Sequence, residues 1–145
     1  MEPPSSYCLP FPMVSLKKTT KKRKDTLFSL GTWNVRGLSA KEKKEQLGKE
    51  CQAYNLDLVC IQETKIANYD EVTLATGHKL VLLQQKTAKH RGLGFVISPR
   101  LIPHIRSWWY ISDRVAAIEV SIPSSRGKPT LYRIVNAYGP TYKSQ

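Results

Sequence analysis

Two short apolar runs, each ending in a polar residue, constrain the fold of this chain more than any other feature. The first covers residues 27–34 and ends at Asn34, and the second covers residues 58–63 and ends at Glu63. The segment between them has a helical pattern, so the unit is predicted to be a right-handed β-α-β crossover with parallel strands. Parallel strands end at the same edge of a sheet, where ligands of open α/β sheets bind. We therefore expect Asn34 and Glu63 to lie side by side.

The connecting segment is predicted to form a helix over about residues 40–54. Ser39 and Glu42 have the spacing of a capping box, with Ser39 as the N-cap. Asn55 is expected to end the helix in the left-handed conformation. Three apolar residues fall on one helical face: Leu47, Cys51 and Tyr54. This pattern is typical of a helix that lies on a sheet.

Downstream, the period changes to short β-like runs, which predict a largely antiparallel continuation. These runs cover residues 80–84, 93–98, 115–121 and 131–138. A loop at residues 123–129, rich in proline, serine and glycine, is expected to join the last two as a hairpin. Gly92 and Gly94 flank Leu93, and this Gly-x-Gly indicates either phosphate binding or close backbone packing.

The charge balance favours an anionic partner. The chain has 145 residues, enough for one domain, with 23 lysines and arginines against 11 acidic residues and a formal net charge of +12. An excess of this size favours DNA or another nucleic acid as the partner. We expect no membrane partner, because the sequence has neither a basic amphipathic helix nor an apolar run long enough to span a bilayer.

Residues 1–25 are predicted to be a flexible basic tail that does not pack, and residues 26–145 to be the folded domain. The basic run at residues 17–24 is interpreted as a nuclear localisation signal, a nucleic-acid arm or a solvated tail. Without the tail's six basic and two acidic residues, the domain keeps 17 basic against 9 acidic residues, a net charge of +8. Three cysteines without CxxC spacing favour reduced thiols. An intracellular, nuclear location is therefore expected.

Glu63 and Asn34 suit metal-assisted phosphodiester chemistry. Magnesium keeps most of its waters and typically takes one or two protein carboxylates, so Glu63 alone is a sufficient anchor. Asn34 beside it would orient a water or hold the carboxylate by hydrogen bonding. We therefore predict a site for Mg²⁺ (or Mn²⁺) at this edge of the sheet.

Three motifs resemble, in the correct order, signatures of the endonuclease/exonuclease/phosphatase superfamily. They are TWNVRGL at residues 32–38, DLVCIQETK at residues 57–65 and NAYGPT at residues 136–141. Within the superfamily, the sequence most resembles the apurinic-like endonuclease domain of non-long-terminal-repeat retrotransposons and of cellular proteins derived from them. The resemblance implies an α/β (α+β) fold, the first half of a four-layer α/β/β/α sandwich of the DNase I-like type with an incomplete second sheet. It also implies magnesium-dependent cleavage of DNA.

The resemblance implies roles for individual residues as well. Glu63 would bind the metal, Asn34 would lie beside the metal as a catalytic group, and Lys65 would support the metal shell. Tyr138 would contact the scissile phosphate or the attacking water.

Arg36 departs from the repair-type apurinic endonucleases, which carry an acidic residue at that place. Retroelement-type sequences tolerate the absence of that acidic residue. We expect Arg36 and Arg91 to bind phosphate or nucleic acid. A surface arginine in the turn before Gly37 explains Arg36 equally well.

The family's later motifs, Asp-x-Asn and Ser-Asp-His, do not occur after Tyr138. They supply the base, the charge-stabilising amide and the catalytic histidine, so this chain is expected to be inactive or weakly active. One face of the first sheet is also expected to be exposed and apolar, which favours self-association. Three consecutive aromatic residues belong to that face or stack on a nucleic-acid base: Trp108, Trp109 and Tyr110.

Two other functions compete with an endonuclease. One is a noncatalytic nucleic-acid-binding remnant, which would use the basic surface without cleavage. The other is a phosphatase or phospholipid phosphodiesterase of the same superfamily. The positive charge and the retroelement-like wording of the signatures disfavour this last alternative.

Overall fold

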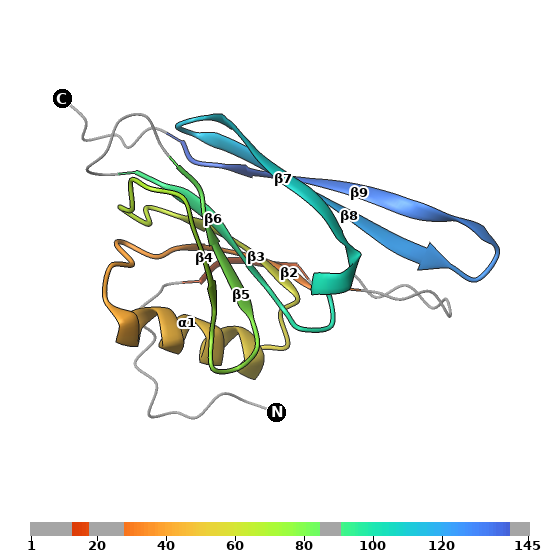
Figure 1. Ribbon diagram of the computed structural model, residues 1–145, viewed down its shortest axis with the longest axis horizontal. Coiled ribbons are helices and arrows are strands. Elements are labelled where there is room, and N and C mark those ends of the chain that lie inside the picture. Colours follow the sequence, from red (N-terminus) through yellow and green to blue (C-terminus); the bar gives the residue numbers. More distant parts are fainter. Residues whose placement is uncertain (1–12, 18–27, 85–90, 140–145) are drawn as a thin grey trace.

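Three layers make up the part of the chain that the computed structural model describes, which is residues 13–17, 28–84 and 91–139 (Figure 1). A helix covers one face of a six-stranded sheet, and a three-stranded sheet covers the other face. The predicted α/β class with a small second sheet, consistent with a partial DNase I-like fold, is confirmed. None of the described residues forms a helix long and apolar enough to cross a membrane.

The first sheet contains the predicted crossover. Its strands, in spatial order, are β1 (Met13–Lys17), β2 (Leu30–Asn34), β3 (Leu58–Gln62), β6 (Leu93–Ile97), β5 (Lys79–Leu82) and β4 (Asp70–Thr73). β2 and β3 are parallel, with Leu30 opposite Leu58 and Asn34 opposite Gln62. All other neighbouring strands are antiparallel.

Helix α1 (Lys41–Ala53) connects β2 to β3 and packs on the first sheet through Leu47 and Cys51, as the sequence pattern predicts. The predicted capping box is wrong. The helix begins one residue later than the capping-box spacing requires, so the N-cap is Ala40, whose methyl group cannot accept a cap hydrogen bond. The predicted end is confirmed, since Asn55 follows the helix with a left-handed φ of 55°.

Side chains of the central strands alternate between the two neighbouring layers. In β3, Val59 and Ile61 pack toward α1, whereas Leu58 and Cys60 pack toward the second sheet. All five residues of β3 and of β6 are buried, which is typical of strands covered on both faces. Both described cysteines, Cys51 and Cys60, are buried free thiols, and burial raises the pKa of Cys60 to about 12.

The second sheet is antiparallel, and its strands are β7 (Ile105–Ser112), β8 (Val115–Ser124) and β9 (Gly127–Ala137), preceded by the short 3-10 helix η1 (Ile102–His104). Its inner face buries four residues of β8 against the first sheet: Ala116, Ile118, Val120 and Ile122. The expectation that this face of the first sheet is exposed is therefore wrong. Apolar side chains are instead exposed on the second sheet, at Ile111, Leu131 and Val135. Self-association itself stays a prediction.

Three strands were not predicted. Met13–Lys17 pairs antiparallel with β2, so the prediction of a tail that does not pack is wrong there, while most of the basic run lies outside the described residues. β4 is a largely exposed edge strand of mostly polar residues, so it lacks an apolar alternation. β7 is only partly buried, and its apolar residues occur consecutively instead of alternating.

The three aromatic residues of β7 do not form one surface. Trp108 packs at the border of the core between the sheets, and its indole nitrogen donates a hydrogen bond to the Tyr69 hydroxyl. On Trp109, the Arg133 guanidinium lies 5.4 Å from the ring centre. Their stacking on a nucleic-acid base stays a prediction.

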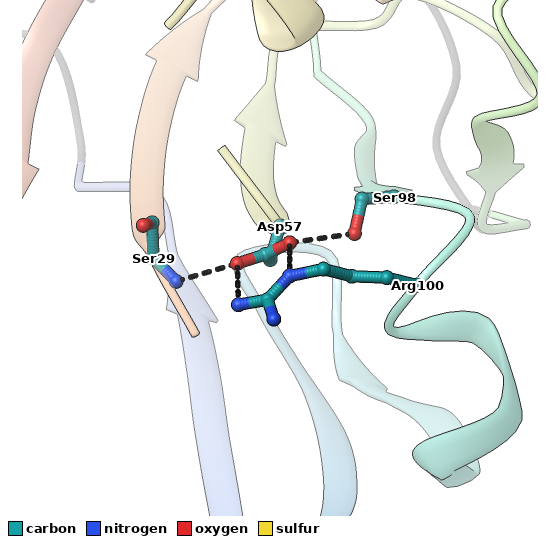
Figure 2. A network of polar contacts seen from close by, with 4 residues as sticks. All are labelled: Ser29, Asp57, Ser98 and Arg100. Atoms are coloured by element: carbon teal, nitrogen blue, oxygen red, sulfur yellow. Dashed lines mark hydrogen bonds and ion pairs between the residues drawn. The ribbon is translucent and has the colours of Figure 1, made fainter. Parts of the chain in front are cut away.

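A polar network holds the strand ends opposite the predicted site (Figure 2). Asp57 accepts two hydrogen bonds from the Arg100 guanidinium, at 2.8 and 2.9 Å, and further ones from the Ser98 hydroxyl and the Ser29 backbone amide. Burial alone would favour the neutral acid, but these donors outweigh it and hold the pKa of Asp57 below its ordinary range. The network joins the starts of β2 and β3 to the end of β6.

Replacing Arg100 by alanine should lower the free energy of unfolding by about 2 kcal/mol, because the buried carboxylate loses its two charged donors. Urea denaturation at neutral pH measures this loss. Arg126→Ala, in the exposed β8–β9 turn, serves as the matched control and should change stability little. An Arg100→Ala variant as stable as the parent would contradict the prediction.

Acid should weaken this network selectively. Because the folded-state pKa of Asp57 lies below the unfolded-state value, the charged carboxylate stabilises the fold above its ordinary pKa range. That contribution is lost as the pH falls through the lowered pKa. In Asp57→Asn, the free energy of unfolding, measured by urea titration, should therefore depend less on pH in the acid range. Asp70→Asn, at an exposed position, should leave this pH dependence unchanged.

Candidate functional site

The crossover brings Asn34 and Glu63 together at the carboxyl ends of β2 and β3. The Asn34 side-chain amide donates a hydrogen bond to Oε2 of Glu63, and Oδ1 of Asn34 accepts one from the Arg36 backbone amide at 3.2 Å. Glu63 lies one residue beyond the end of β3. The amide therefore holds the carboxylate at the edge of the sheet where ligands were expected.

Tyr138 closes the site from the second sheet. It follows β9, and its hydroxyl donates a hydrogen bond to the same Oε2 of Glu63 at 3.2 Å. Burial, and then the charge and hydrogen bond of Glu63, raise the pKa of Tyr138. The hydroxyl therefore keeps its proton at neutral pH and acts as a donor.

Backbone strain is concentrated at this site. Three non-glycine residues here have left-handed φ angles: Arg36 at 51°, Glu63 at 56° and Lys65 at 57°. In a regular strand, Glu63 would point to the face opposite Gln62, but the left-handed residue breaks that alternation. Strained backbone of this kind clusters at functional sites and costs about 1–3 kcal/mol per residue.

Hydrogen bonds between the two loops hold this strained backbone. The amides of Val35, Gly37 and Leu38 donate to the carbonyls of residues 62, 63 and 64, at 2.9, 2.6 and 2.9 Å. Backbone hydrogen bonding therefore continues past the ends of β2 and β3 into the loops that carry the site. No local sequence signal indicated this continuation.

Several cationic residues lie on the loops next to Glu63. Arg36 and Lys65 lie on the two strained loops, and the Lys65 backbone amide donates to the Arg91 carbonyl at 2.8 Å. The charges of Arg91 and Arg114 oppose the rise in the Tyr138 pKa, which indicates that both lie near its hydroxyl. Arg36, Lys65 and Arg91 thus lie on backbone segments that adjoin Glu63; their roles stay predictions.

Two further cations belong to the site and were not predicted from the sequence. Lys43 of α1 donates to the carbonyls of Val35 and Arg36, at 2.8 and 3.4 Å. Burial, and then the charges of Lys65 and Arg36, lower the pKa of Lys43. Arg114 lies 5.8 Å from the centre of the Tyr138 ring. Lys43 resembled the other lysines of the polar helix face, so its sequence gave no distinguishing signal.

Close packing explains Gly92 and Gly94. At Gly92, where φ is 124°, an added Cβ would lie 2.1 Å from the Thr64 hydroxyl oxygen. At Gly94, an added Cβ would lie 2.4 Å from the Val81 carbonyl oxygen. Gly92 therefore supports the site by letting the 64–65 loop approach β6, which favours the packing interpretation over phosphate binding.

The donor set fits a magnesium ion that keeps most of its waters. Within the described residues, no three histidine, cysteine or acidic side chains form a metal-binding cluster, so Glu63 is the anchor that the site offers. Both hydrogen bonds from Asn34 and Tyr138 go to Oε2. This arrangement leaves Oε1 for a cation, and one carboxylate is enough for Mg²⁺.

Comparison with protein families matches residues 31–144 to the endonuclease/exonuclease/phosphatase family. The matched segment contains the crossover, most of both sheets and all six predicted site residues. A search among curated proteins finds no significant match to the chain.

Lys43→Met should lower the free energy of unfolding by about 1–2 kcal/mol, because the carbonyl of the buried Val35 loses a charged donor. Urea denaturation measures the change, and amide hydrogen exchange at Gly37 should accelerate as the two loops loosen. Lys49→Met, at an exposed position on the same helix, is the control and should leave both measurements unchanged. Equal behaviour of the two variants would contradict the assignment of Lys43 to the site.

Proposed function

Because the chain belongs to the endonuclease/exonuclease/phosphatase family, we propose that it is a magnesium-dependent DNA endonuclease of the retroelement type. Membership in the family implies a hydrolase of the nuclease or phosphatase kind. The observation that supports cleavage of DNA is the arrangement at Glu63, where an amide and a phenol hold one carboxylate and cationic residues lie near Lys43 and Tyr138 on the adjoining segments.

Glu63 would hold the metal, with Asn34 next to it. Bound Mg²⁺ (or Mn²⁺) supplies a Lewis acid that polarises a phosphoryl oxygen. Asn34 orients the carboxylate by its hydrogen bond to Oε2. Lys65 lies on the strained loop directly after Glu63, where its charge supports a phosphate or the metal shell.

Tyr138 and the cations would bind the phosphodiester. Since the raised pKa keeps the Tyr138 hydroxyl protonated, this group can donate a hydrogen bond to a phosphate oxygen once a ligand enters. Arg36 and Arg91 would attract the backbone phosphates of DNA through charge-assisted hydrogen bonds. These donors and cations would balance the negative charge of a phosphodiester bound there.

We propose further that the 145-residue chain cleaves slowly. The described side chains that donate to Glu63 are an amide and a phenol, neither of which is a general base at neutral pH. The two histidines of the described segments lie elsewhere, His78 in the turn between β4 and β5 and His104 in η1. Activation of the attacking water is therefore the step that this site supports least.

Nucleic-acid binding without cleavage is the second candidate function. It is favoured by the cationic residues on the loops next to Glu63, and by the basic net charge that residues 26–145 carry on their own. Binding of this kind depends on counterion release, so it should weaken steeply with salt.

The chain should nick supercoiled plasmid DNA slowly in Mg²⁺ and not at all in EDTA. Glu63→Ala should reduce the nicking rate at least about a hundredfold, because the metal loses its anchor. Glu71→Ala, which removes an exposed carboxylate from β4, is the matched control and should nick at the parent rate. Nicking that survives Glu63→Ala would sink the proposed mechanism. DNA binding without any nicking would favour the second candidate.

Arg36→Ala should weaken DNA binding at every sequence and reduce the slope of log K against log salt by about one. The reason is that one phosphate contact, with its released counterion, is lost. Fluorescence anisotropy of a labelled duplex at several salt concentrations measures the slope. Arg126→Ala, in the turn of the β8–β9 hairpin, should leave it unchanged. An unaltered slope in Arg36→Ala would show that this arginine does not touch phosphate.

A further inference from the structure

A buried polar network crosses the apolar interface between the two sheets directly behind the site. Its centre is Asn136 of β9, which is 1% exposed. The Asn136 amide donates to the carbonyls of Ile61 in β3 and Gly94 in β6, each at 3.0 Å. These two residues are opposite each other in the first sheet. One side chain of the second sheet thus binds two adjacent strands of the first.

Gln62 completes the network from the first sheet. Its side-chain amide donates to Oδ1 of Asn136 at 2.9 Å and to the Thr32 hydroxyl of β2 at 2.8 Å. Gln62 is 7% exposed, so both amides are largely removed from water. A buried amide that loses its partners is costly, so this network tolerates only one relative placement of the strands.

The apolar contacts around this network do not fix such a placement. Packing between Ile118 or Val120 and the first sheet is non-directional, and apolar interfaces of this kind tolerate small shifts. Hydrogen bonds to two fixed backbone carbonyls are directional and fail after a shift of about 1 Å. The position of β9 relative to β3 is therefore set by Asn136.

The network is adjacent in sequence to both halves of the site. Glu63 follows Gln62 directly, and Tyr138 is two residues beyond Asn136. Tyr138 and Glu63 meet through one hydrogen bond of 3.2 Å between segments 75 residues apart. A small displacement of β9 would therefore separate the phenol from the carboxylate.

We propose that Asn136, with Gln62 as its partner, is the positioning residue that holds the Tyr138 hydroxyl against Glu63. The importance of this contact for catalysis rests on the proposed function. The placement itself is a property of the chain and is measurable without metal, DNA or turnover.

The test is a nuclear magnetic resonance measurement on the full chain labelled with ¹³C at the tyrosine Cζ position. The Tyr138 signal is identified by its loss in Tyr138→Phe, and its position without the contact is given by Glu63→Ala. In Asn136→Ala, the Tyr138 signal should move to the position that it has in Glu63→Ala. A signal that stays at the parent position in folded Asn136→Ala would overturn the proposal.

Two controls separate positioning from a general loss of stability. Ile118→Ala removes an apolar side chain from the same interface and should destabilise the fold while leaving the Tyr138 signal in place. Val135→Ala, on the exposed side of the same strand, should also leave it in place. An equal displacement in Ile118→Ala would overturn the proposal, since any loosening of the interface would then suffice.

A milder variant covers the case in which Asn136→Ala does not fold. Gln62→Met removes one of the three hydrogen bonds that the Asn136 side chain makes within the described residues, and it should displace the Tyr138 signal in the same direction by a smaller amount. No displacement in folded Gln62→Met would overturn the proposal. Absence of nicking by the parent protein would refute the proposed function alone, because the spectroscopic result does not depend on activity.

Discussion

Parallel pairing between β2 and β3 is the interaction on which the rest of the molecule depends. Its register places Asn34 opposite Gln62, and the hydrogen bonds continue past both strand ends to residues 35–38 and 62–64. The amide of Asn34 consequently reaches the carboxylate of Glu63. At the other end of the same strands, Asp57 and Arg100 fasten the starts of β2 and β3 to the end of β6. The crossover is thus fixed at both ends by polar contacts, with apolar layers between them.

Sequence patterns predicted the elements with extensive burial. The helical face with Leu47 and Cys51 was recognised from its period, and β3, which is buried on both faces, was recognised from its continuous apolar run. β4 was missed because it is an exposed edge strand, held by backbone pairing that any residue type can make. The prediction of Ser39 as the N-cap was wrong because the helix begins one residue later. The spacing of Ser39 and Glu42 is the same in the sequence, but the Ser39 side chain no longer caps the helix.

For the site, proximity was predictable but geometry was not. Strand ends of a parallel pair must meet, which is why Asn34 and Glu63 were expected together. The left-handed backbone at Glu63 has no signature in its residue type, because glutamate does not favour that conformation. Lys43 approaches the site through the tertiary packing of α1, and Asn136 reaches it across two sheets. The contact of Lys43 with the site loop and the contact of Asn136 with the first sheet arise only after the layers have assembled.

The long loop closure between Glu63 and Tyr138 has a consequence for the order of folding. Asn34 and Glu63 are joined across 29 residues, most of them in one crossover, whereas Tyr138 meets Glu63 across 75 residues. Contacts distant in sequence form late, because their loop-closure entropy is repaid only when the rest is in place. On a ribosome, the carboxylate and its amide would therefore be assembled first, and the phenol would arrive later, with β9. Closure of this hydrogen bond would then mark the moment at which the two sheets have docked.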